Sequence, residues 1–201
     1  MTYDLLIALL GFGIVTSVTP GPNNMMLLAS GVNFGLRRTV PHMLGISLGH
    51  ALMVFLVGLG IAGMFRAWPP ALTLLKTGSV AYMLWLAWKI ANSGAPGEGK
   101  ARAEPLSFLQ AAAFQWVNPK AWAMALGAVT AYVATPSAAA YLLVAVIFMV
   151  VNFPSVMIWA AAGQGLRRWL EGPARLRAFN WTMAVLLVAS LYPIIVDTGM
   201  F

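Results

Sequence analysis

The sequence of 201 residues has no cysteine, two histidines and only five acidic residues. The lack of cysteine excludes disulfide scaffolds, thiolate zinc sites and iron–sulfur clusters. So few histidines and acids also argue against a preformed metal site, and we expect no metal and no cofactor. Charged residues make up 8% of the chain and hydrophobic residues 61%, whereas a soluble domain carries about 25% charged residues. This composition predicts a polytopic membrane protein.

The charged residues that are present are mostly basic, with a formal net charge of +7. In an apolar chain, basic residues gather in cytoplasmic loops, so we expect the lipid bilayer as a partner and no nucleic acid. Nine of the twelve basic residues fall in the segments near 31–38, 89–106 and 166–177, whereas the alternate segments hold only Arg66 and Lys76. The positive-inside rule therefore predicts that both termini face outward.

Six segments approach the roughly 20 apolar residues that a helix needs to cross a bilayer. They cover about 3–30, 40–64, 72–91, 107–134, 137–166 and 179–196. The first segment lacks the basic start and the A-x-A-like end of a cleaved signal peptide, so we interpret it as a retained span. The prediction is an all-α membrane protein with six transmembrane helices, in a single polytopic domain over 1–201.

A hydrophilic linker at 92–106 divides these spans into two halves, 1–91 and 107–201. Each half has three spans, so two similar halves would lie in the membrane in opposite orientations. Proline interrupts the first and fourth helices, at Pro20 and Pro22 and at Pro119. Interrupted spans at matching positions of two repeats indicate a transporter binding site. We therefore expect two inverted three-helix repeats.

The interrupted spans carry the candidate binding residues. Proline frees backbone groups that need partners inside a bilayer, and a helix that restarts there presents N–H groups that attract a carboxylate. Asn118 followed by Pro119 suits such a restart. Asn152 is added because we expect a further break at Pro154. The predicted substrate-binding residues are Pro20, Gly21, Pro22, Asn23, Asn24, Gln115, Asn118, Pro119, Lys120 and Asn152.

Lys120 lies about 20 Å along its span at 1.5 Å per residue, too deep for a simple anchor at the membrane surface. A lysine in mid-bilayer costs about 2.5–3.5 kcal/mol on insertion scales. No acidic residue lies inside a span, so we expect a substrate carboxylate or a backbone carbonyl as its partner. A lysine that snorkels along a kinked, tilted helix is the alternative.

Both histidines fall in the second span. His50 lies near its middle and is a candidate for proton coupling, because histidine titrates near neutral pH. A hydrogen bond to a neighbouring backbone carbonyl is the alternative role. His42, near the cytoplasmic end, is a weaker candidate.

Four segments resemble the hallmark segments of the LysE/RhtB superfamily of amino-acid exporters. They are Thr19-Pro-Gly-Pro-Asn-Asn24, Gly45-Ile-Ser-Leu-Gly49, Lys76-Thr-Gly-Ser-Val-Ala-Tyr-Met-Leu-Trp-Leu-Ala-Trp-Lys89 and Phe114-Gln-Trp-Val-Asn-Pro-Lys-Ala-Trp122. The resemblance covers nearly the whole chain. Within the superfamily, which also contains the homoserine/threonine exporters, the first and third segments most resemble the cysteine/O-acetylserine exporter branch. The resemblance implies a secondary transporter, not an enzyme, that exports an amino acid across the bacterial inner membrane and is driven by the proton gradient.

The charge of the membrane interior bears on the substrate. A lysine or arginine substrate would add a second cation near Lys120, and at an effective dielectric of about 20 two like charges roughly 6 Å apart repel by about 3 kcal/mol. We therefore expect a small neutral amino acid or derivative as substrate. The resemblance implies protons as the coupling ion. A structural or assembly subunit and an exporter of another solute, such as a basic amino acid, stay open as alternatives.

Glycines spaced four apart predict close approaches between helices. Two such pairs occur, Gly31 with Gly35 and Gly45 with Gly49. These small faces permit a homodimer without requiring one.

Overall fold

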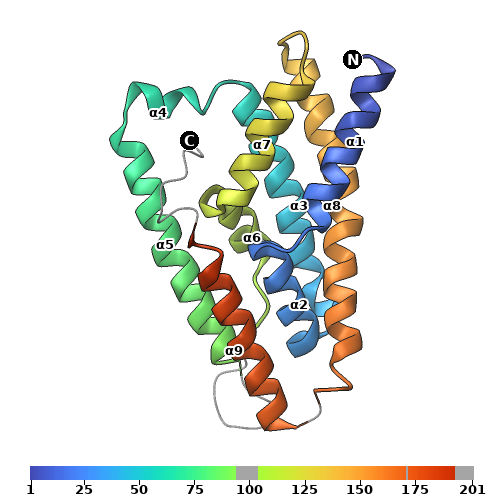
Figure 1. Ribbon diagram of the computed structural model, residues 1–201, viewed down its shortest axis with the longest axis vertical. Coiled ribbons are helices and arrows are strands. Elements are labelled where there is room, and N and C mark those ends of the chain that lie inside the picture. Colours follow the sequence, from blue (N-terminus) through green and yellow to red (C-terminus); the bar gives the residue numbers. More distant parts are fainter. Residues whose placement is uncertain (94–103, 171, 193–201) are drawn as a thin grey trace.

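The computed structural model describes residues 1–93, 104–170 and 172–192, which form helices and no strand (Figure 1). The helices are α1 (Tyr3–Val18), α2 (Pro22–Phe34), α3 (Leu36–Gly58), α4 (Gly63–Ala67), α5 (Pro70–Ala91), α6 (Phe108–Phe114), the 3-10 helix η1 (Gln115–Val117), α7 (Pro119–Tyr132), α8 (Ala138–Leu166) and α9 (Pro173–Ala189). The predicted all-α class is confirmed. Most of the predicted linker, 94–103, lies outside the described residues.

Within the described ranges, α3 and α8 are each long and apolar enough to cross a membrane. The pair α1 and α2 also qualifies if it counts as one span, bent by 54° at its break. Length and composition thus support two spans, or three with the bent pair. The helices α5 and α9 are not among these candidates. The helix α9 is short, with 17 residues, and α5 carries two charged residues, Lys76 and Lys89.

The helices run in alternating directions between two ends of the molecule (Figure 1). From the upper end, α1 and α2 descend in succession, α3 rises and α5 descends, whereas α6 and α7 rise, α8 descends and α9 rises. At the lower end, α2, α5 and α8 end and α3 and α9 begin (Figure 1). The residues near these helix ends in the sequence include Arg37, Lys89, Arg167 and Arg175. We call this end the basic end.

Proline and glycine set several helix boundaries. Pro173 occupies the first turn of α9 after Gly172, whose φ is 136°, so this helix begins before the expected residue 179. Proline suits that position because the first N–H groups of a helix have no intrahelical partner. The second predicted span also shifts, from 40–64 to Leu36–Gly58. The chain turns at Gly60, where φ is 101°, and α4 follows.

The break expected at Pro154 is wrong, because α8 continues through it from Ala138 to Leu166. A proline inside a helix removes one hydrogen bond and costs about 3 kcal/mol. The packing of α8 against α1, α2 and α3 supports the helix across this defect. At 20–22, by contrast, two prolines flank a glycine, and the helix stops.

Buried apolar side chains form two clusters, one toward the basic end and one toward the opposite end. Along α8, Val156 belongs to the first cluster and Phe148 to the second, and the buried Asn152 lies between them. His50 holds the same intermediate place on α3, between Ile46 and Met53. A layer of polar side chains therefore separates two apolar layers.

Glycine lets α2 and α8 approach closely. A Cβ atom on Gly31 would collide with the carbonyl oxygen of Ala160, and one on Gly163 with that of Leu28. The packing role predicted for Gly31 is confirmed. Gly35 has another role, because its φ of 78° places it in the turn between α2 and α3.

Candidate functional site

The first break lies between α1 and α2. Its free carbonyl groups find a donor in Asn24, whose side-chain amide bonds the carbonyl oxygens of Ser17 at 2.9 Å and Thr19 at 2.8 Å. Asn24 is 3% exposed. This asparagine thereby provides the partner that interrupted backbone needs inside a bilayer.

The second break lies between α6 and α7, with the single turn η1 between them. Asn118 is the N-cap of α7, as expected, and its Oδ1 accepts from the backbone N–H of Lys120 at 3.1 Å. Across the same break, the indole N–H of Trp122 donates to the carbonyl oxygen of Trp116 at 2.9 Å. The break is therefore an ordered feature with its own hydrogen bonds.

Lys120 joins the two breaks. Its ammonium donates to the carbonyl oxygen of Thr19 at 2.6 Å, to the Thr19 hydroxyl at 2.9 Å and to the carbonyl oxygen of Pro20 at 3.4 Å. The sequence predicted either a substrate carboxylate or a backbone carbonyl as the partner of Lys120, and the structure shows the backbone carbonyl. A Cβ atom on Gly21 would lie 2.7 Å from the Cδ of Lys120, so glycine at 21 makes room for this contact.

A pair of amides also joins the two halves of the chain. The Nδ2 of Asn23 donates to the Oε1 of Gln115 at 2.8 Å, and the Nε2 of Gln115 donates to the Oδ1 of Asn23 at 3.2 Å. Gln115 makes a further bond, to the carbonyl oxygen of Ala111 at 2.9 Å. This reciprocal pair fixes the start of α2 against η1.

Asn152 reaches the same region from α8 and brings in two serines that the sequence reasoning missed. Its Oδ1 accepts from the Ser47 hydroxyl at 3.0 Å, and its Nδ2 donates to the Ser17 hydroxyl at 3.3 Å. A signal for Ser47 was available, because it lies three residues before His50 and therefore on the same helix face. Ser17 stands immediately before the first break.

These groups surround a pocket with about 320 Å³ of space not filled by protein atoms, part of it open to solvent. Seven of the ten predicted substrate-binding residues line it, and so does His50: Gly21, Asn23, Asn24, His50, Gln115, Asn118, Lys120 and Asn152. We call it the central pocket. Pro20, Pro22 and Pro119 are not among its lining residues and instead set the course of the backbone. Lys120 is the only lysine, arginine, aspartate or glutamate among the described residues that line the pocket.

His50 differs from its neighbours in the central pocket. Its side chain is 2% exposed, and neither ring nitrogen has a hydrogen-bond partner in the described part of the chain. The ring packs edge-on against Phe148 with centroids 5.4 Å apart. The backbone-carbonyl bond considered for His50 is therefore not present, and both nitrogens are open to a ligand or a proton.

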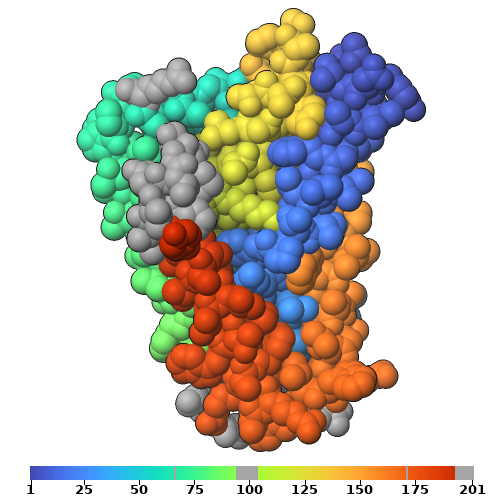
Figure 2. All heavy atoms as spheres, viewed as in Figure 1, coloured from blue at the N-terminus to red at the C-terminus, as the bar shows by residue number. Residues whose placement is uncertain are grey.

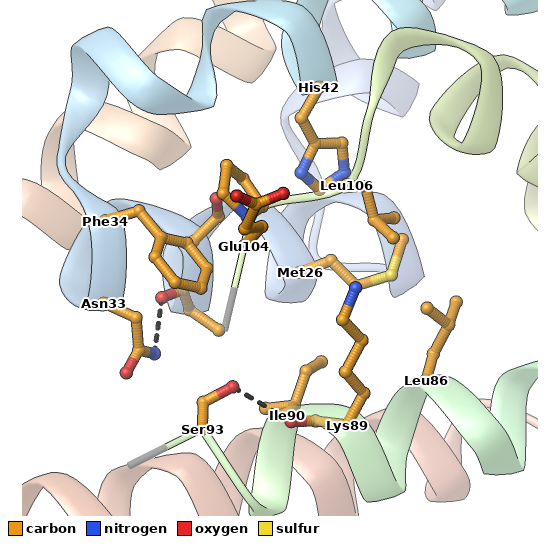
Figure 3. A pocket seen from close by; sticks show the side chains of 13 residues that line it. Met26, Asn33, Phe34, His42, Leu86, Lys89, Ile90, Ser93, Glu104 and Leu106 are labelled. Atoms are coloured by element: carbon orange, nitrogen blue, oxygen red, sulfur yellow. Dashed lines mark hydrogen bonds between the residues drawn. The ribbon is translucent and has the colours of Figure 1, made fainter. Parts of the chain in front are cut away.

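The two predicted histidines do not share a site. His42 lines another pocket, nearer the basic end (Figure 3). In the described ranges, no group of three or more histidine, aspartate or glutamate side chains is placed to hold a metal ion.

Apolar helices with two interrupted segments that meet at a polar pocket define a helical membrane protein of the transporter class. The family model described as LysE type translocator matches residues 14–190. The chain belongs to the LysE-type translocator family, as the resemblance predicted.

Three curated relatives extend this result. The chain is 35% identical, over 192 residues, to the cysteine/O-acetylserine efflux proteins of Escherichia coli (strain K12), Shigella sonnei (strain Ss046) and Shigella flexneri. Each match covers 94% of this chain and 96% of the relative. No solved structure matches the chain.

Proposed function

We propose that this protein is a secondary transporter that exports a small neutral amino acid or derivative across the bacterial inner membrane, with protons as the coupling ion. The observation that carries the proposal is the meeting of two interrupted helices at a pocket lined by amides and one lysine. The relatives are named as cysteine/O-acetylserine efflux proteins, so cysteine and O-acetylserine are the first substrates to test.

The proposed architecture has six spans in two inverted repeats. In this scheme α1 and α2 correspond to α6 and α7, α3 to α8, and α5 to α9, and each pair runs in opposite directions in Figure 1. If the chain has this symmetry, each contact between helices should have a counterpart in which the two halves are exchanged. The contact of α1 with α8 then corresponds to that of α6 with α3. The contact of α2 with α8 corresponds to that of α7 with α3, and the contact of α2 with α3 to that of α7 with α8. All six contacts occur, which supports the repeat.

The proposed topology places the basic end in the cytoplasm and both termini outside. Reporter fusions after Glu98 and after Phe201 should then report the cytoplasm and the outer side, respectively. Two reporters on the same side of the membrane would refute this topology.

Substrate recognition is proposed to use opposite ends of a zwitterion. Lys120 and the N-termini of α2 and α7 attract the carboxylate. The ammonium binds neutral oxygen atoms, supplied by Asn23, Asn24 and Asn152. The described lining has no acidic residue, so a cationic side chain would have no counter-charge there and would be repelled by Lys120.

His50 is the proposed proton-coupling residue. It lies on the wall of the central pocket, and its unpartnered nitrogens can exchange a proton there. Because it lies between the two apolar clusters, it is well placed to pass a proton through the apolar interior from one side of the membrane to the other.

The test uses the purified protein in liposomes, with cysteine, O-acetylserine, threonine, homoserine, lysine and arginine as substrates. We expect movement of the neutral compounds between compartments, and its loss when an ionophore removes the proton gradient. Preferential movement of lysine or arginine would refute the substrate class. No movement of any compound would favour a structural or assembly role.

A further inference from the structure

A second pocket lies nearer the basic end, among α2, α3, α5 and the segment before α6 (Figure 3). It has about 400 Å³ of space not filled by protein atoms, part of it open to solvent. Much of its wall is apolar, with Met26, Leu86 and Leu106 among the lining side chains. We call it the basic-end pocket. The same helix lines both pockets, because Asn23 faces the central pocket and Met26 the basic-end pocket, about one turn apart on α2.

The basic-end pocket contains a buried polar side chain without a partner. His42 is 1% exposed, and neither ring nitrogen has a hydrogen-bond partner in the part of the chain that the structure describes. Figure 3 shows its imidazole extending from α3 into the pocket. An unpaired buried polar group is costly to the fold, and native proteins rarely leave one without a partner. A ligand in this pocket would supply one.

The pocket also carries one charge of each sign. Lys89 reaches into it from α5, and Glu104 from the segment before α6 (Figure 3). The Lys89 ammonium lies 5.5 Å from the centre of the Trp85 ring. Among the described residues, neither Lys89 nor Glu104 has an ion-pair partner within 4.0 Å. Both charges are therefore available to a ligand.

The neutral amide of the wall, Asn33, is by contrast already bonded to Asn180, which is not among the lining residues. Asn33 donates to the Oδ1 of Asn180 at 2.9 Å and to the carbonyl oxygen of Ala29 at 2.8 Å, and Asn180 donates to the carbonyl oxygen of Ser93. These bonds connect α2, α9 and the end of α5 into a fixed frame. The groups left for a ligand are then an ammonium, a carboxylate and an imidazole.

We propose that the basic-end pocket is a second binding site for a zwitterionic amino acid, which is captured there from the cytoplasm before it moves to the central pocket. Lys89 binds its carboxylate, Glu104 its ammonium, and His42 a polar atom of its side chain. The inference rests on the proposed function, because capture from the cytoplasm requires an exporter whose basic end faces the cytoplasm. The apolar part of the wall suits a small side chain without charge.

The test measures uptake of cysteine, kept reduced, into inside-out membrane vesicles, where uptake corresponds to export. Lys89→Gln and Glu104→Gln should each raise KM by about tenfold or more, as expected for the loss of a charge-assisted hydrogen bond, with the maximal rate within about twofold. Lys89→Arg should restore most of the affinity. Arg175→Gln removes an exposed cation near the same end and should change neither value.

Two inhibitors distinguish a binding role from a structural one. Cysteamine has no carboxylate, so Lys89→Gln should leave its inhibition constant unchanged. 3-Mercaptopropionate has no ammonium, so Glu104→Gln should leave its inhibition constant unchanged. A merely structural role would weaken both inhibitors together in each variant.

The outcomes separate the two proposals. Normal wild-type uptake with an unchanged KM in both Gln variants would overturn the capture site and leave the exporter intact. No uptake by the wild-type protein would overturn the proposed function and this inference with it. If Lys89→Gln fails to accumulate in the membrane, Glu104→Gln decides, because Glu104 is exposed and outside the helices.

Discussion

Replacement of Lys120 separates a role in substrate binding from a role in the fold. Lys120→Met removes both the charge and the three donated hydrogen bonds, which reach Thr19 and Pro20. Lys120→Gln removes the charge but retains an N–H donor that can still point toward those oxygen atoms. A comparison of the two variants therefore separates the effect of the charge on substrate binding from the effect of the hydrogen bonds on the fold.

The expected size follows from the contacts of the ammonium. At an effective dielectric of about 20, a carboxylate about 4 Å away would gain about 4 kcal/mol. Part of this gain is offset, because the substrate must replace oxygen atoms that already lie 2.6–3.4 Å from the nitrogen. A net value of about 1.5–3 kcal/mol, typical of a hydrogen bond to a charged group, corresponds to an affinity about 10- to 150-fold lower.

The assay is uptake of cysteine into inside-out vesicles over a range of concentrations, normalised to the amount of inserted protein. Both variants should show the loss of affinity. Only Lys120→Met should also lower the free energy of unfolding, by about 1–3 kcal/mol, because it leaves the carbonyl groups of Thr19 and Pro20 without a donor. A Lys120→Met protein with unchanged KM and full rate would show that the lysine is a snorkelling anchor.

Three further predictions concern the packing and polar contacts of the same region. In a double-mutant cycle, Asn23→Ala and Gln115→Ala should be coupled by about 0.5–3 kcal/mol in thermal unfolding, and strict additivity would contradict the amide pair. Gly163→Leu should destabilise the detergent-solubilised protein by about 1–3 kcal/mol or more, because its side chain meets the Leu28 carbonyl; an unchanged unfolding temperature would argue against this helix crossing. His50→Gln should stop uptake driven by a proton gradient and preserve exchange of labelled for unlabelled substrate, whereas retained gradient-driven uptake would exclude His50 from coupling.

The two interruptions could be predicted from the sequence because the effect of proline on a helix is local. Pro22 and Pro119 each lie at the start of a helix, and Asn118 caps the second one as its residue type suggested. The partners across the pocket could not be predicted in this way. The Thr19 carbonyl that binds Lys120 is 101 residues away in the chain, and only packing brings it there.

The same local signal failed at Pro154. An asparagine precedes Pro154 by two residues, as Asn118 directly precedes Pro119 at the second break. However, α8 is supported on several sides by other helices and continues. Asn152 nevertheless lines the central pocket, although the break that suggested it does not occur. The basic-end pocket was not foreseen, since it depends on how three helices and the segment before α6 pack together.

The contact between Lys120 and the first break also bears on when this protein can change shape. Without substrate, the ammonium ties the end of α1 to the start of α7, and Figure 2 shows these two helices meeting on one face of the molecule. A carboxylate that takes over the ammonium releases the carbonyl groups of Thr19 and Pro20. In the mechanism that we propose, this one side chain would link substrate binding to the mobility of the two helices, because the substrate would displace the contact that holds them together. If the protein is the proton-coupled exporter that we propose, this contact would keep it closed when empty, and the gradient would not be dissipated.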